Sequence, residues 1–224
     1  AGSRFRVHIV FQGIAVGLAA ESGLLPMRWM YVAKPLCMAL MIAHAWRRGH
    51  DTPAVRRFVL SGLTFSLIGD VFLMWPSGGF LPGLAAFLLA HLAYIAAFST
   101  RSRFFARWVP FAAYAMVACG ILVTLWRDLS HGLRVPVLLY VLCMSTMASQ
   151  AAVVWLCARG TGDEAIARLG VIGGGLFVVA ELLLAANRTA GPLPLVPLLV
   201  LLSYWGAQWF IASSLRERAG PTSP

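Results

Sequence analysis

The sequence predicts an all-α membrane protein, a polytopic bundle of about eight transmembrane helices, on three observations. Its 224 residues are 60% hydrophobic and only 12% charged, whereas soluble domains carry about 25% charged residues. Apolar runs close to the ~20 residues needed to cross a bilayer follow one another along the chain. The connections between these runs are short, so we expect a single integral-membrane domain over residues 1–224.

The expected helices follow directly from the apolar runs. The first run follows Arg4 and Arg6 and could pass for a signal peptide, but its length and the runs behind it favour a membrane span. Tryptophans near the ends of the runs are typical of the two membrane interfaces. The expected spans are about 7–25, 29–46, 58–76, 80–99, 108–126, 133–157, 167–187 and 193–214.

The arginines are distributed unequally between the two ends of these runs. If both termini lie on one side, thirteen of the seventeen arginines fall on that side and four on the other. Because cytoplasmic loops are enriched in Lys and Arg, we expect a multi-pass protein of the cell (inner) membrane with both termini in the cytoplasm. The net charge of +10 therefore indicates contact with lipid headgroups, and we expect no nucleic-acid partner.

A few charged side chains lie inside the apolar runs. Asp70 follows Gly62 and Ser66 at helical spacing, which gives one small, polar stripe. An ionised side chain at the bilayer centre costs about 2.5–3.5 kcal/mol on insertion scales, so such residues normally face a bundle interior or a wet cavity. Lys34, the only lysine, and Glu181 fall with Asp70 in the outer half of the bilayer when the runs alternate in direction.

These embedded charges predict one shared cavity. Glu21 falls at a similar depth, and His91 lies near the middle of its run. Two carboxylates in one cavity are typical of acid–base chemistry, in which one carboxyl group is protonated and the other ionised. The alternative is that Lys34 pairs with one acid only to hold helices together. We expect Lys34, Asp70, His91 and Glu181 to line the cavity.

Other residue patterns exclude several kinds of site. Asp70, His91 and Glu181 show no paired metal-ligand spacing, so we expect no metal and no cofactor. His91 and Tyr94 share a helix face, and His91 is either a site residue or a hydrogen-bonded interior residue. The glycines of the run 167–187 permit close helix approach, and a GxSxG motif is absent.

Short motifs occur once per expected helix and in a fixed order. They are Ala33-Lys34-Pro35-Leu36, Gly69-Asp70-Val71-Phe72-Leu73, Gly83-x-x-x-Phe87-x-x-x-His91-x-x-Tyr94, Tyr140 with Met147, Phe177-x-x-x-Glu181-x-x-Leu184-x-x-Asn187-Arg188, and Tyr204-x-x-x-Gln208. In this combination the chain resembles the lysoplasmalogenase family of eight-span membrane proteins, also called the YhhN type. The chain departs from the family at Ala180-Glu181, where the family usually shows Ser-Asp, so the carboxylate is kept but its reach differs.

The resemblance implies an intramembrane hydrolase that cleaves the vinyl ether bond of lysoplasmalogens to a fatty aldehyde and a glycerophospho-base. It implies a lysophospholipid substrate and membrane lipids as partners, without a cofactor. Asp70 is then the expected acid and Glu181 the carboxylate that orients water, with the reverse assignment open. The implied substrate-binding residues are Lys34, His91, Tyr94, Tyr140, Asn187, Arg188, Tyr204 and Gln208.

Two further hypotheses come from other classes of protein. A proton-coupled membrane carrier or lipid transporter also uses membrane-embedded Asp, Glu, His and Lys. Transporters commonly show inverted repeats and broken helices, whereas this chain has one clear mid-span break, at Pro35, and no convincing inverted repeat. A purely structural or partner-binding protein leaves the embedded charges unexplained.

Reporter fusion tests the expected orientation. A reporter enzyme that is active only in the periplasm should show no activity when it is fused to the C-terminus, because the arginine bias places that end in the cytoplasm. A reporter active in the cytoplasm is the matched control and should be active at the same position. A strong periplasmic signal would contradict the topology and move Asp70 and Glu181 to the cytoplasmic half of the bilayer.

Overall fold

The computed structural model describes residues 30–75, 77–189 and 195–217, and within these ranges the chain is helical without strands. The all-α prediction is therefore confirmed for the described part of the chain. The first expected span, 7–25, and Glu21 lie outside the described residues. The helices are α2 (Met30–Trp46), α3 (Pro53–Leu73), α4 (Phe80–Ser99), α5 (Trp108–Leu125), α6 (His131–Ala158), α7 (Glu164–Thr189) and α8 (Val196–Ser213).

The helix ends differ little from the expected spans. The largest difference is at α3, which begins at Pro53 instead of residue 58. Proline fits the first turn of a helix, because its fixed φ is helical and its missing N–H would have no partner there. Among the helices of the described ranges, five, α4 to α8, are long and apolar enough to cross a membrane, which indicates a multi-pass membrane protein. The number of eight spans remains a prediction.

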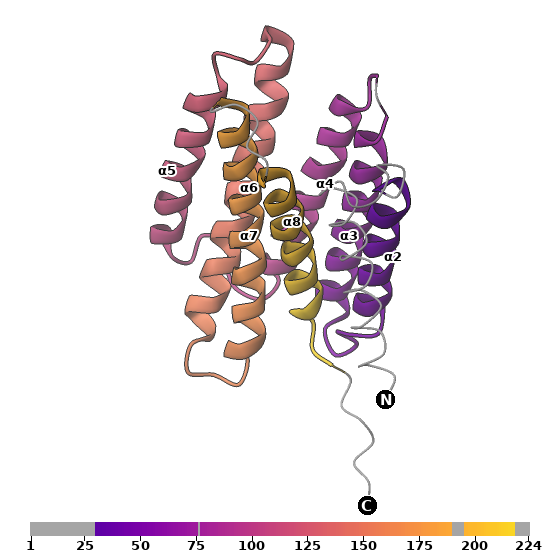
Figure 1. Ribbon diagram of the computed structural model, residues 1–224. Coiled ribbons are helices and arrows are strands. Elements are labelled where there is room, and N and C mark those ends of the chain that lie inside the picture. Colours follow the sequence, from indigo (N-terminus) through magenta and orange to yellow (C-terminus); the bar gives the residue numbers. More distant parts are fainter. Residues whose placement is uncertain (1–29, 76, 190–194, 218–224) are drawn as a thin grey trace, which may run out of the picture.

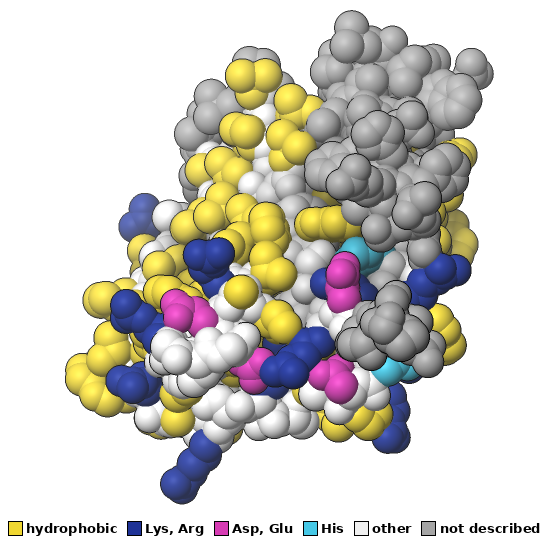
Figure 2. Space-filling view, turned by 90° about the horizontal axis from the view of Figure 1, so that it is seen from below, with side chains coloured by type: hydrophobic (Ala, Val, Ile, Leu, Met, Phe, Trp, Pro, Cys, Tyr) yellow, Lys and Arg dark blue, Asp and Glu magenta, His cyan; other side chains and the backbone are white. Residues whose placement is uncertain are grey.

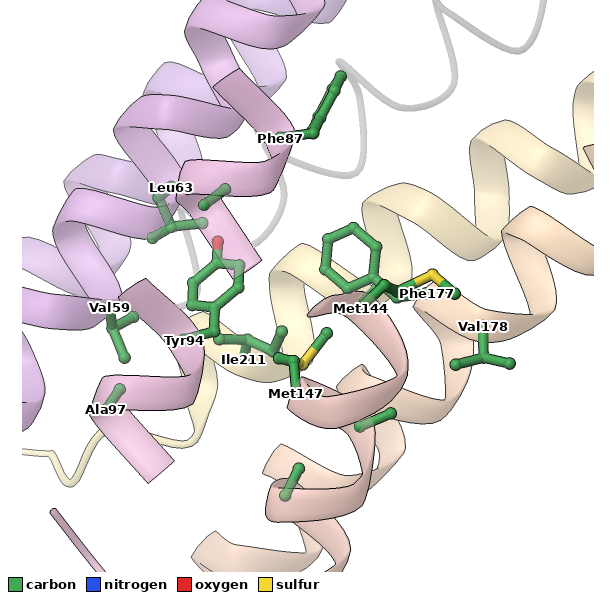
Figure 3. Packing of buried hydrophobic residues seen from close by; sticks show 14 of the residues in the cluster. Val59, Leu63, Phe87, Tyr94, Ala97, Met144, Met147, Phe177, Val178 and Ile211 are labelled. Atoms are coloured by element: carbon green, nitrogen blue, oxygen red, sulfur yellow. The ribbon is translucent and has the colours of Figure 1, made fainter. Parts of the chain in front are cut away.

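The helices form two groups with α8 between them (Figure 1). Helices α2, α3 and α4 make up one side of the bundle, and α5, α6 and α7 make up the other. Contacts between α4 and α6 join the two groups, and α8 packs mainly on α7. Figure 3 shows core side chains from both groups, among them Leu63, Tyr94, Met144, Phe177 and Ile211.

Glycines on α3 make room for large aromatic side chains of α4. A Cβ atom on Gly62 would lie within 2.7 Å of three Tyr94 ring atoms, and one on Gly69 would lie 2.7 Å from the ring of Phe87. The polar stripe that Gly62 begins is therefore also a packing surface. On α7, a Cβ atom on Gly173 would lie 2.9 Å from the Ala207 carbonyl oxygen of α8, so the expected close helix approach is confirmed there.

Arginines gather at one end of the bundle, where α8 ends. Figure 2, seen from that end, shows Lys and Arg side chains interspersed with acidic ones. Arg48 donates a hydrogen bond from Nε to the carbonyl of Leu215 at 2.9 Å, and Arg101 donates to the carbonyl of Ser214 at 2.8 Å. Arg48 also forms a 2.6 Å ion pair with Glu217. Two loops thus satisfy carbonyl groups just beyond the C-terminus of α8. That this end is cytoplasmic remains a prediction.

The glycine–aromatic contacts predict a specific loss of stability. The Gly62→Ala substitution should lower the free energy of unfolding by about 1–3 kcal/mol, because the added methyl group overpacks the Tyr94 ring. Gly120→Ala is the matched control, since no other group lies within 4 Å of a Cβ atom at Gly120. Unfolding of both variants in detergent measures the difference. Equal stability of the Gly62→Ala protein and the wild type would contradict the packing argument.

Candidate active site

A cavity of about 380 Å³ lies in the half of the bundle opposite the arginine-rich end. Its volume falls in the range of about 300–1,000 Å³ that is usual for small-molecule sites. Most of the lining side chains are apolar and come from α3 to α8. The polar or ionisable side chains in its wall are Lys34, Asp70, Tyr140, Glu181, Asn187 and Tyr204.

Asp70 is held in the wall of this cavity near the C-terminal end of α3. Its side chain is only 5% exposed, and the O–H of Tyr204 on α8 donates a hydrogen bond to its Oδ2 atom at 2.8 Å. Lys34 of α2 lines the same cavity as Asp70. No ion pair between Lys34 and a carboxylate occurs in the described part of the chain. The alternative in which Lys34 pairs with one acid to hold helices together therefore has no direct ion pair to support it among the described residues.

Glu181 occupies an equivalent arrangement on the other side of the bundle. It lies on α7, and the O–H of Tyr140 on α6 donates a hydrogen bond to its Oε1 atom at 2.5 Å. Each carboxylate is therefore paired with a phenol from a neighbouring helix. Hydrogen bonds to ionised groups are shorter and stronger than neutral ones, so these phenols are suited to hold buried carboxylates in place.

Tyr94 and Gln208 lie outside the cavity lining, although the sequence motifs suggest that they bind substrate. Both side chains are fully buried, and the O–H of Tyr94 donates a hydrogen bond to Oε1 of Gln208 at 2.6 Å. Gln208 lies one helical turn from Tyr204 on α8. The pair joins α4 to α8 directly behind the phenol that contacts Asp70.

His91 also lies behind the cavity wall and does not line it. It is fully buried between two lining residues, with its ring 5.3 Å from that of Tyr140 and 5.0 Å from that of Phe177. Neither ring nitrogen has a hydrogen-bond partner among the described residues. His91 is therefore not among the side chains that line the cavity in the structure described, and its expected role in the site stays a prediction.

Two rings of the aromatic floor of the cavity, Phe87 and Phe177, belong to the sequence motifs but were not among the expected site residues. Phe87 and Phe177 both lie against the ring of Tyr204, at centroid distances of 5.9 Å and 5.7 Å. The spacing of Phe87, His91 and Tyr94 on one face of α4 was the available signal.

Asn187 lines the cavity, whereas the side chain of Arg188 lies outside the described residues.

No group of three or more metal-ligating residues that could hold a metal ion occurs within the described ranges. The fold and the cavity together define a class: a multi-pass helical membrane protein with two phenol-paired carboxylates in a mainly apolar internal site. Such a site suits acid–base chemistry on a largely apolar ligand.

Comparisons with known proteins agree with this class. The YhhN family profile matches residues 29–215, and the chain belongs to the YhhN family. A Mycobacterium bovis protein named lysoplasmalogenase is 31% identical over 195 residues, which are 83% of this chain and 74% of the relative. Lysoplasmalogenase TMEM86A of Bos taurus is 30% identical over 172 residues, covering 75% and 68% of the two chains. The resemblance that the sequence motifs indicate is thereby confirmed.

A more distant relative carries no assigned activity in its name. The uncharacterized membrane protein YhhN of Escherichia coli O157:H7 is 27% identical over 128 residues, which are 57% of this chain and 60% of the relative. No solved structure matches the chain.

The buried Tyr94–Gln208 pair makes a stability prediction. Gln208→Leu should cost about 1–3 kcal/mol of unfolding free energy, because it leaves the buried Tyr94 hydroxyl without its acceptor. Adding Tyr94→Phe removes the orphaned group, so the double variant should recover part of the loss. A double variant whose loss equals the sum of the two single losses, measured by unfolding in detergent, would refute this coupling.

Proposed function

We propose that this protein is an intramembrane lysoplasmalogenase. It hydrolyses the vinyl ether bond of a single-chain lysophospholipid and releases a fatty aldehyde and a glycerophospho-base. Relatives that are named lysoplasmalogenase and match most of the chain support an enzyme of this kind. The observation that carries the proposal to particular residues is that Asp70 and Glu181, from different helices, line the same largely apolar cavity.

The first chemical step is protonation of the vinyl ether. Asp70, as the acid, transfers its proton to the β-carbon of the double bond, and the electron pair of the ether oxygen stabilises the positive charge that develops on the α-carbon. The product is an oxocarbenium ion. A negative charge nearby lowers the free energy of the transition state most strongly where water is excluded, and the ionised Glu181 supplies it.

The second step captures that cation with water. Glu181 accepts a proton from a water molecule while the water oxygen bonds to the α-carbon, which gives a hemiacetal. The hemiacetal then breaks its bond to the glycerol oxygen. Glu181 returns its proton to that oxygen, the ionised Asp70 takes the proton of the hemiacetal hydroxyl, and the aldehyde leaves with both carboxyl groups back in their starting states. A pair of carboxylates divides acid and base roles similarly at glycosidic bonds, where the transition state is also oxocarbenium-like.

The neighbouring side chains have roles consistent with this chemistry. Tyr204 and Tyr140 fix the orientations of the two carboxylates through their hydrogen bonds. Lys34 supplies a positive charge in the same cavity as Asp70 and is available to an anionic headgroup. Asn187 lies in the same wall near the end of α7, where a glycerophosphate group at headgroup depth would come within reach.

Substitution of the two carboxylates tests the catalytic assignment. Asp70→Asn keeps the size of the side chain but removes the transferable proton, so aldehyde release should fall by about 10²–10⁴-fold, which is the usual contribution of general acid catalysis. Glu181→Gln should be similarly damaging, because the amide cannot accept the proton of water. Aldehyde release from a lysoplasmalogen by the purified variants measures both effects.

Two further variants act as controls in this assay. Glu181→Asp, which restores the usual family residue, should retain activity, because it keeps the carboxylate. Asp128→Asn removes an exposed carboxylate from the loop between α5 and α6 and should leave the rate unchanged. Asp70→Asn working at the wild-type rate would refute the catalytic assignment. Transport by the wild type without aldehyde release would instead favour the carrier hypothesis.

A further inference from the structure

We infer that the cavity contains a separate binding arm for one hydrocarbon chain, located between the outer halves of α4 and α6 and the end of α5. This assignment rests on the proposed function, since it places the alkenyl chain of the lysolipid in that arm. The side chains that line this arm are those of Phe80, Leu84, Leu125, Leu129, Val137 and Val141.

Aromatic rings pack against one another on the inner side of the cavity. Phe87, Phe177 and Tyr204 pack ring against ring there. His91, fully buried, fills the space behind Phe177. A long alkenyl chain spans about half of the ~30 Å hydrocarbon core of a bilayer. Once its vinyl ether lies beside Asp70, we expect such a chain to run sideways between helices.

The cavity lies between α4 and α6 in the half of the bundle opposite the arginine-rich end. The two helices approach closely where Cys143 contacts the carbonyl of Leu88 at 3.9 Å and where the rings of His91 and Tyr140 meet. One and two turns further out, Leu84 and Phe80 on α4 line the cavity. So does Val137 on α6, and the cavity therefore lies between the two helices at this level. Phe80 is 44% exposed, which puts the mouth of the arm at the bundle surface.

The positions of the charged and the apolar side chains in the cavity match the structure of a single-chain lipid. Lys34 lies on α2, whereas Leu125 and Leu129 belong to the end of α5 and the residues that follow it. Helices α2 and α5 lie on opposite sides of the bundle (Figure 1). The cationic side chain of Lys34 thus lies on the side of α2, and the apolar arm lies at the end of α5, with Asp70 and Glu181 also in the cavity wall. A single-chain lipid has the same polarity, with an anionic headgroup at one end and a hydrocarbon chain at the other.

Bulky substitutions in the arm test the assignment with two substrates. We would compare kcat/KM for lysoplasmalogens that carry a hexadecenyl or a butenyl chain. Leu84→Trp and Val137→Trp should each lower the hexadecenyl-to-butenyl ratio by about tenfold or more, because a few methylene groups of lost room change discrimination by about 10–200-fold. Leu84→Phe and Val137→Leu replace these variants if either fails to fold.

Matched controls lie on the opposite faces of the same two helices. Leu89 on α4 is 45% exposed and Val135 on α6 is 62% exposed, and neither lines the cavity. Leu89→Trp and Val135→Trp should therefore leave the ratio unchanged. An unchanged ratio in both arm variants, or an equal fall in arm and control variants, would overturn the assignment.

A binding measurement separates this inference from the proposed function. Hexadecylphosphocholine has a single chain and a phosphate headgroup but no vinyl ether, so its binding does not depend on catalysis. If the wild type releases no aldehyde, the proposed function fails. Binding of hexadecylphosphocholine then remains as the test of whether the arm holds a hydrocarbon chain. Leu84→Trp should then weaken its binding about tenfold. Binding equal to that of the wild type would overturn the arm.

Discussion

The main constraint on this structure is the free-energy cost of burying carboxylates among apolar helices. A buried ionised group without partners is strongly unfavourable, and each carboxylate here has a phenol donor on a neighbouring helix. The same two hydrogen bonds tie α3 to α8 and α6 to α7. These two hydrogen bonds therefore serve both the proposed reaction and the packing of the helices. In the proposed reaction, each proton transfer also changes a bond that holds two helices together.

Close packing supplies the precision that such a site needs. The absence of side chains at Gly62 and Gly69 lets Tyr94 and Phe87 lie directly on α3. Phe87 in turn packs against Tyr204, and Tyr94 is fixed by Gln208. The phenol that contacts Asp70 is thus located by side chains that never touch a ligand. In a sequence motif such residues look like substrate-binding residues. In the structure, however, Tyr94 and Gln208 lie behind the side chains that line the cavity.

Much of the fold follows from the sequence because its signals are local. Apolar length predicts each described helix, and the cost of a charge in the bilayer predicts that Asp70 faces the interior. The pairings were not predictable in this way. Which phenol reaches which carboxylate depends on how helices distant in sequence rotate and cross, as with Tyr140 and Glu181. Periodicity likewise places His91 on an inward face, but it does not tell a lining residue from one that two aromatic rings cover.

The arginine contacts around the end of α8 have a consequence for the opposite half of the molecule. Arg48 and Arg101 belong to loops at the arginine-rich end, yet they fix the helix that carries Tyr204. Backbone hydrogen bonds run along the whole of α8, which is 18 residues long, so contacts at its C-terminal end also bear on the position of Tyr204 at its middle. The geometry around Asp70 is therefore set partly from the far side of the bundle. Two arginines that do not line the cavity thus help to hold in place the helix whose tyrosine contacts Asp70.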